Sequence, residues 1–147
     1  MQQNTNIQLK AICTKDTYVV RHPVLRNGLP LESCAFDVDD EPNTLHLGAF
    51  ANDTLVGVLT LLPKPESVQL RGMAVLEHFQ GQGIGKQLVA HAEQHVRQQN
   101  ICTVWMNARL IAVPFYEACG YQKQGDTFEL PYGGTHYYML KNLCEEV

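Results

Sequence analysis

Seven residues decide how this chain folds: Gln80-Gly81-Gln82-Gly83-Ile84-Gly85-Lys86. They follow a strand-like run, Val68–Val75, and lead into a helix-like run from Ile84 to about Gln98. Glycine lets the backbone approach a ligand closely and adopts dihedral angles that other residues avoid. A helix that begins here exposes unpaired N–H groups at the positive end of its dipole. The stretch therefore predicts an anion site, most naturally for phosphate.

Three kinds of phosphate loop contain such glycines, and their spacing separates them. A P-loop needs a glycine five residues before the Gly-Lys pair and a Ser or Thr after the lysine, but Gln80 and Gln87 hold those positions. The dinucleotide fingerprint G-x-G-x-x-G needs a third glycine where Lys86 stands, and it belongs on a first strand. The pattern Gln80-x-x-Gly83-x-Gly85 remains, with a plain glycine turn before a helix as the simplest alternative.

Hydrophobic periodicity around this stretch predicts an α/β protein with the element order β-α-loop-β-β-β-α-β-α-β-β. Strands are expected at 7–12, 44–50, 54–62, 67–75, 101–106, 121–123 and 135–140, and helices at 14–26, 84–98 and 111–119. Pro23 predicts a kink or break in the first helix. In the helix after the loop, an apolar stripe should face the sheet: Ile84, Leu88, Ala92 and Val96. The polar residues expected on its exposed side are Lys86, Gln87, Glu93, Gln94, Arg97 and Gln98.

The glycine pattern resembles the pyrophosphate loop of the GCN5-related N-acetyltransferases (GNAT). In that family the loop joins the fourth strand to the third helix and holds the diphosphate of acetyl-CoA. A second stretch, Ala112-Val113-Pro114-Phe115-Tyr116-Glu117-Ala118-Cys119-Gly120-Tyr121, is similar to the family's A-x-x-(F/L)-Y-E-x-x-G-(F/Y) element. The tail from Gly125 to Met139 is similar to a bacterial subgroup that includes ElaA-like acetyltransferases. The resemblance covers about Ser67 to Leu140, half of the chain.

The resemblance implies a fold and a cofactor site. The fold would be a mixed central sheet of six to seven strands with about four helices, and the pyrophosphate loop would lie between strand 4 and helix 3. Acetyl-CoA would be the co-substrate, with its pantetheine arm paired to the backbone of strand 4 and its pyrophosphate on the loop. The residues implied are Met73, Ala74, Val75, Gln80, Gly81, Gln82, Gly83, Ile84, Gly85 and Lys86. Many members carry an asparagine seven residues before the tyrosine, where this chain has Arg109, so either Arg109 or Asn107 is expected to contact the pantetheine arm.

Composition limits the remaining choices. The 147 residues fit one domain, 1–147, and a net charge of −4 argues against a nucleic-acid partner but is compatible with an amine substrate. No apolar run approaches the roughly 20 residues that span a bilayer, and residues 1–6 lack a secretory signal pattern. Five scattered cysteines without a C-x-x-C pair predict no disulfide framework, no zinc site and a reducing cytoplasm. A homodimer is left open.

The resemblance also names a catalytic residue, Tyr116, which would protonate or hydrogen-bond the departing sulfur. A backbone N–H near Val75 would stabilise the oxyanion. The sequence does not decide the general base. Candidates are His136, Glu129, Asp126 and His46, acting directly or through water. The acidic cluster Asp37–Glu41 is expected to be a solvated loop, with attraction of an amine cation as the alternative.

Metal binding is not expected. His91 and His95 lie four residues apart on the helix after the loop, but the glutamate of an H-E-x-x-H motif is displaced and no third ligand is evident. The leading hypothesis is an acetyl-CoA-dependent N-acetyltransferase that transfers the acetyl group directly to a primary amine. The alternative is a non-catalytic acyl-CoA-binding sensor or regulatory module.

Overall fold

The computed structural model describes residues 6–144 and contains one seven-stranded sheet with strand order β1-β2-β3-β4-β5-β7-β6. Its strands are β1 (Ile7–Ile12), β2 (Leu45–Ala51), β3 (Thr54–Pro63), β4 (Ser67–Val75), β5 (Thr103–Arg109), β6 (Gln122–Leu130) and β7 (Gly134–Asn142). The α-helices are α1 (Thr14–Leu25), α2 (Ile84–Gln98) and α3 (Val113–Ala118), and the 3-10 turns are η1 (Leu31–Cys34), η2 (Glu77–Phe79) and η3 (Leu110–Ala112).

The predicted α/β class and element order are confirmed, whereas the expected count of about four helices is wrong for the described residues. These contain three α-helices, because the turn-rich segment 27–43 forms only η1. The glycine loop, expected between strand 4 and helix 3, therefore lies between β4 and the second α-helix, α2. Helix α1 continues through Pro23 to Leu25 without the predicted break. None of the helices in residues 6–144 is long and apolar enough to cross a bilayer.

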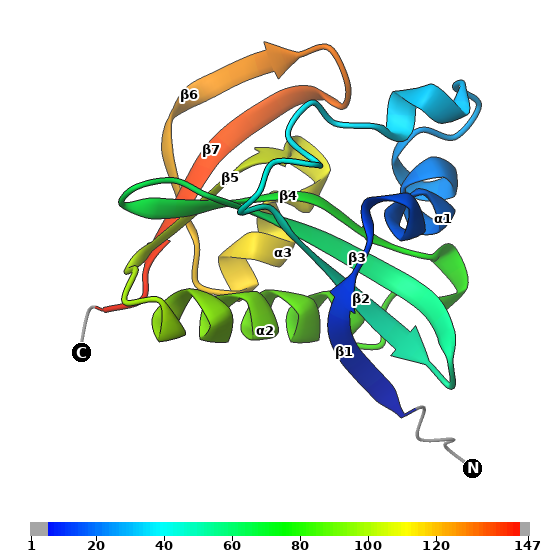
Figure 1. Ribbon diagram of the computed structural model, residues 1–147. Helices are drawn as coiled ribbons and strands as arrows, with labels where there is room; N and C mark the ends of the chain where they lie inside the picture. The colour runs from blue at the N-terminus through cyan, green and yellow to red at the C-terminus, as the bar shows by residue number, and fades with distance from the viewer. Residues whose placement is uncertain (1–5, 145–147) are drawn as a thin grey trace.

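Helices cover both faces of the sheet (Figure 1). The predicted stripe of α2 is confirmed, since its four apolar residues are buried in the main core with Val104, Met106 and Ala108 of β5. On the opposite face, Val20 of α1 packs on Val58 and Ala74. Alternate residues of β5, including Asn107 and Arg109, therefore face away from α2.

Glu93 corrects the expected surface of α2. It is buried, and its carboxylate accepts hydrogen bonds from the Tyr121 hydroxyl at 2.9 Å and from Lys141 Nζ at 3.1 Å. Tyr121 follows α3 and Lys141 lies on β7, so partners distant in the sequence make burial of this charge tolerable.

The strands β4 and β5 pair only at one end and separate beyond it, which leaves an opening between them. They are the sheet's parallel pair, connected through α2, and their register covers only Ser67–Gln69 opposite Thr103–Trp105. Beyond Gln69, β4 continues to Val75 without a β5 partner. The β3–β4 register also shifts between Val58 and Thr60, which leaves Gly72 at φ +67°. A bulged strand with a free edge is suited to bind a ligand's backbone-like arm.

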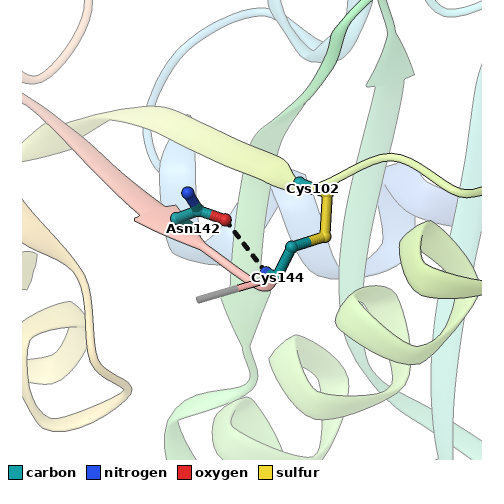
Figure 2. Close-up of a disulfide and its surroundings, with 3 residues drawn as sticks. All are labelled: Cys102, Asn142 and Cys144. Atoms are coloured by element: carbon teal, nitrogen blue, oxygen red, sulfur yellow. Dashed lines mark hydrogen bonds between the residues drawn. A yellow bond between two sulfur atoms is a disulfide. The ribbon is translucent and has the colours of Figure 1, made fainter. Parts of the chain in front are cut away.

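A disulfide joins Cys102 to Cys144, so the prediction that the cysteines stay unpaired is wrong for these two (Figure 2). They lie just beyond the paired residues Thr103 and Asn142 of β5 and β7, with Cα atoms 5.2 Å apart. The Cys144 N–H also donates to Asn142 Oδ1 at 2.9 Å. Strand pairing, which spacing in the sequence does not show, brings the two cysteines together. A cytoplasmic location stays a prediction, and the cysteines no longer support it because two of them are paired.

Candidate active site

The glycine loop ends in a helix N-terminus with free donors. Gly81 and Gly83 have φ values of +78° and +82°, and Gly83 is the N-cap of α2. The first helical hydrogen bond runs from Gln87 N–H to the Gly83 carbonyl at 3.1 Å, so the N–H groups of residues 84–86 have no helical acceptor. Most of the loop is exposed, with Ile84 buried beneath it. The geometry is that of an anion site built from backbone.

The two glutamine side chains of the loop shape it, and Lys86 adds an exposed positive charge. Gln80 Nε2 donates to the Val75 carbonyl at 2.9 Å, and Gln82 Nε2 donates to the His78 carbonyl at 3.3 Å. These bonds fold η2 back on the end of β4. Gln80 and Gln82 thus lie within the loop as predicted. The Gln80 N–H itself donates to the Glu77 carbonyl at 3.2 Å and closes η2.

Gly85 connects the loop to α3. A β-carbon at Gly85 would lie 3.1 Å from Phe115 Cζ, so a larger residue would have to displace the Phe115 ring by a few tenths of an ångström. Phe115 precedes Tyr116, and their rings make an edge-to-face contact at 5.1 Å. The two signatures that lie apart in the sequence are therefore in contact.

Tyr116 is buried and neutral. Burial raises the pKa of its phenol well above the usual value of 10, so the hydroxyl keeps its proton in the physiological range. Its ring also meets Tyr121 edge-to-face at 5.9 Å. Within residues 6–144 the hydroxyl has no hydrogen-bond partner. Tyr116 is therefore a hydrogen-bond donor held in place by its ring and free at its oxygen.

The predicted strand residues, Met73, Ala74 and Val75, lie on the part of β4 that has no partner in β5. Met73 and Val75 pack against the core under α2, whereas Ala74 packs under α1. Because β5 does not pair with this segment, its edge is available to a pantetheine-like chain. Asn107 and Arg109 lie on the other side of the opening, on the β5 face turned away from α2. Arg109 Nε lies 2.6 Å from the position of a β-carbon on Gly133, in the β6–β7 turn.

The four candidate bases have different environments. His136 is buried, and its Nδ1–H donates to the Gly134 carbonyl at 2.7 Å, which leaves Nε2 as the basic nitrogen. Glu129 and Asp126 are exposed, and Glu129 accepts a hydrogen bond from the Thr135 hydroxyl at 2.8 Å. His46 lies elsewhere, in a buried network under α1.

That network uses Asp39, which the sequence placed in an acidic loop. Asp39 is buried, and its oxygens accept from Arg21 Nη1 at 2.8 Å and Nη2 at 3.0 Å. Arg21 Nη2 also donates to Thr60 Oγ1 at 2.9 Å. His46 Nε2–H donates to the Asp39 carbonyl at 3.0 Å, and its Nδ1 lies 2.7 Å from Thr60 Oγ1. Both ring nitrogens of His46 are thus engaged. The expectation of a fully solvated cluster is wrong at Asp39.

The geometry agrees with a family. The model of the acetyltransferase (GNAT) family matches residues 14–121, more than half of the chain. The chain belongs to this family. The GNAT match contains the loop, the β4 edge and Tyr116. The protein is therefore an acetyltransferase, an enzyme that transfers an acyl group from coenzyme A.

Relatives of this GNAT chain agree in length and fold. "Uncharacterized N-acetyltransferase YitI" of Bacillus subtilis (strain 168) is 33% identical over 144 residues, which cover 93% of this chain and 97% of the relative. The ribosomal-protein-S18-alanine N-acetyltransferase of Escherichia coli superposes with a TM-score of 0.79 at 15% identity, covering 97% of each chain. An aminoglycoside 6'-N-acetyltransferase in complex with coenzyme A superposes with a TM-score of 0.79 at 15% identity, covering 95% of this chain and 99% of that chain. The two structures show the shared fold alone.

The structure adds one feature near the site that sequence reasoning missed, and that feature is not a metal centre. Within residues 6–144, no group of three His, Cys, Asp or Glu side chains is arranged to hold a metal ion. Instead, Arg26 and Arg71 gather with Arg21 around the ring of Phe36, at 5.6, 4.4 and 3.8 Å from its centroid. The sequence contained one signal for this group of arginines: Arg71 lies among apolar residues on a strand.

Proposed function

We propose that this GNAT enzyme is an N-acetyltransferase that moves the acetyl group of acetyl-CoA directly to a primary amine. One observation carries the proposal: the unpaired edge of β4 runs into a loop whose free N–H groups begin α2. A pantetheine arm along Met73–Val75 would bring the pyrophosphate to residues 80–86. We infer that the chain acts as one domain, 1–147.

The proposed reaction needs no covalent intermediate on the enzyme. The amine nitrogen attacks the thioester carbonyl, and the carbonyl oxygen becomes an oxyanion near the Val75 backbone, where one N–H donor is worth about 10²–10³ in rate. The C–S bond breaks, and the Tyr116 hydroxyl donates a hydrogen bond to the thiolate. Its raised pKa makes full proton transfer to sulfur unfavourable, so hydrogen bonding is the role that fits.

We propose His136 as the general base. A free alkyl amine has a pKa near 10.4, so it is mostly protonated at neutral pH and must lose a proton before or during attack. His136 is the one buried candidate with a basic nitrogen left over, and it lies opposite Arg109 on the face turned away from α2. Its partner Gly134 holds the ring in one tautomer.

The sensor alternative has no observation of its own in its favour. Family membership makes the chain an enzyme, and Tyr116 offers a protonated hydroxyl that a binding module would not need.

Binding and transfer are tested separately. Acetyl-CoA, unlike ATP or NAD, should raise the melting temperature by mass action, equivalent to about 2.7 kcal/mol at 100 times Kd. Gly83→Ala should reduce this shift because a side chain disfavours φ +82° at the N-cap. Gly125→Ala is the matched control, with φ +74°, no atom within 4 Å of its β-carbon and a position on β6. Thiol release over a panel of amines then tests transfer, and binding without release on any amine contradicts the proposal.

A further inference from the structure

Three arginine side chains lie close together on the sheet face opposite α2. Arg26 follows α1, Arg71 lies on β4 and Arg109 ends β5. We call these three residues the arginine cluster. The segment after α1 and the β6–β7 turn lie on the same side of the sheet in Figure 1. The Arg26 guanidinium lies 3.9 Å from the Tyr132 ring centroid in that turn.

Aromatic rings and one glycine hold the cluster. Arg71 stacks 4.4 Å from the Phe36 ring centroid, and Arg26 lies 5.6 Å from the same centroid. Arg109 lies against Gly133, the residue after Tyr132. Phe36 itself is buried, fixed by its N–H donating to Asp39 Oδ2 at 2.8 Å. The three guanidinium groups are thus brought together by the fold.

No carboxylate in residues 6–144 lies within 4.0 Å of the cluster's charges. Asp39, the buried acid nearby, is taken by Arg21. Asp37 is exposed and acts on Arg71 only at longer range. Within the same residues the guanidinium groups of Arg71 and Arg109 make no hydrogen bond, and that of Arg26 uses only Nε and Nη1, on the Ser33 and Leu25 carbonyls.

The arginines also act on one another. Burial first, and then the charge of Arg109, lowers the pKa of Arg26 from its usual value. Positive charges collected without a carboxylate in direct contact repel each other, and Asp39 and Asp37 act on Arg71 only from a distance. This occurs in a chain whose net charge is −4. An anion bound between them would relieve the repulsion. Guanidinium groups bind carboxylates through two parallel hydrogen bonds.

The position of the cluster indicates which substrate supplies the anion. Arg71 lies two residues before Met73, and Arg109 two residues after Asn107, so the cluster flanks the opening between β4 and β5. The phosphates of acetyl-CoA are expected at the N-terminus of α2, which packs on the opposite face. The anion should therefore belong to the acceptor.

We propose that the acceptor is a small amine that carries an anionic group, a carboxylate of the amino-acid type, and that the arginine cluster binds this group. The proposal rests on the proposed function. It takes the place of the alternative in which the acidic cluster 37–41 attracts a cationic amine, because Asp39 is buried and paired with Arg21.

The first test compares matched acceptors. Amino acids are assayed against their carboxamides and against the amines that lack the carboxylate, with phosphoethanolamine and ethanolamine as a phosphate pair. The carboxylate form should have a kcat/KM about 10–100-fold higher, as expected for hydrogen bonds to a charged group. A preference for phosphoethanolamine over ethanolamine, without a preference for amino acids over their carboxamides, would show that the cluster binds a phosphate. That result would overturn the carboxylate assignment. Equal or better use of the neutral forms would overturn the inference while N-acetyl transfer stands.

Variants and binding complete the test. Arg71→Gln and Arg109→Gln should each lower kcat/KM about 10-fold or more for the carboxylate acceptor and little for its carboxamide, whereas a structural role would lower both. Arg97→Gln, exposed on α2, is the control. All variants should keep the acetyl-CoA melting shift; its loss in Arg109→Gln would assign Arg109 to the cofactor and overturn its place here. With CoA bound, wild type should bind N-acetylamino acids more tightly than their amides, which tests the cluster even if no acceptor is turned over.

Discussion

His136 and Arg109 lie directly opposite each other, on β7 and β5. Opposite residues of an antiparallel pair share one face of the sheet, so the proposed base lies beside the proposed anion site. His136→Gln should lower kcat about 10²-fold or more, since general base catalysis contributes about 10²–10⁴. The defect should shrink with an acceptor whose amine has a low pKa, such as a hydrazine. Steady-state kinetics with both acceptors measures this.

Glu129→Gln and Asp126→Asn are the controls for His136, because both side chains are exposed. They should keep near wild-type kcat. An equal loss with both kinds of acceptor in His136→Gln would show that the ring only supports the fold.

Tyr116→Phe should lower kcat about 10–100-fold and leave the acetyl-CoA melting shift unchanged. The reason is the loss of one hydrogen bond to a charged thiolate, worth roughly 1.5–3 kcal/mol. Because burial raises its pKa, Tyr116 stays protonated, and its role should not titrate below about pH 10. Unchanged kcat in the variant would remove Tyr116 from the mechanism.

Alkaline pH should destabilise the protein through two buried phenols. Burial raises the pKa of Tyr116 and, with the negative charge of Glu93, that of Tyr121. A raised phenol pKa stabilises the fold below the unfolded value near 10, and this contribution is lost as the pH rises above it. The melting temperature should fall as the pH rises above about 10, and less steeply in Tyr121→Phe. An equally steep fall in the variant would contradict this origin.

Reduction of the disulfide should lower the free energy of unfolding by about 2–4 kcal/mol. Cys102 and Cys144 close a loop with a sequence separation of 42 residues, and cross-linking removes entropy from the unfolded chain. Urea unfolding with and without reductant measures the difference. Cys102→Ser should behave like reduced wild type and show no further response to reductant, whereas Cys13→Ser, a free exposed cysteine, should respond like wild type.

Gly85→Ala should weaken acetyl-CoA binding several-fold without lowering stability. Alanine favours a helix by about 1 kcal/mol over glycine, which offsets the contact at 3.1 Å with Phe115. The contact should instead shift the N-terminus of α2 and its N–H groups. Kd and melting temperature are measured together. The double variant with Phe115→Leu should regain affinity, and unchanged Kd in Gly85→Ala would show that the loop tolerates the shift.

Local patterns in the sequence predicted most of the fold. The bounds of β1, β4 and α2 agree with the predicted 7–12, 67–75 and 84–98, because each has a clear period and clear end signals. Asn100 has φ +61°, as expected of a left-handed helix cap. Strands β6 and β7 are longer than predicted, since their pairing with each other extends them beyond their apolar residues.

The sequence by itself determined the donor side: the glycine loop, the start of α2 and the tyrosine of α3 are continuous local motifs. Only the tertiary structure decided the partners of Glu93, the burial of Asp39 and the Cys102–Cys144 bond. It also decided that Arg21, Arg26 and Arg71 meet at the ring of Phe36. These depend on strand order and register, which pair residues far apart in the chain. A local motif can encode a backbone conformation, but the charge that surrounds a site is the sum of all the elements that fold against it.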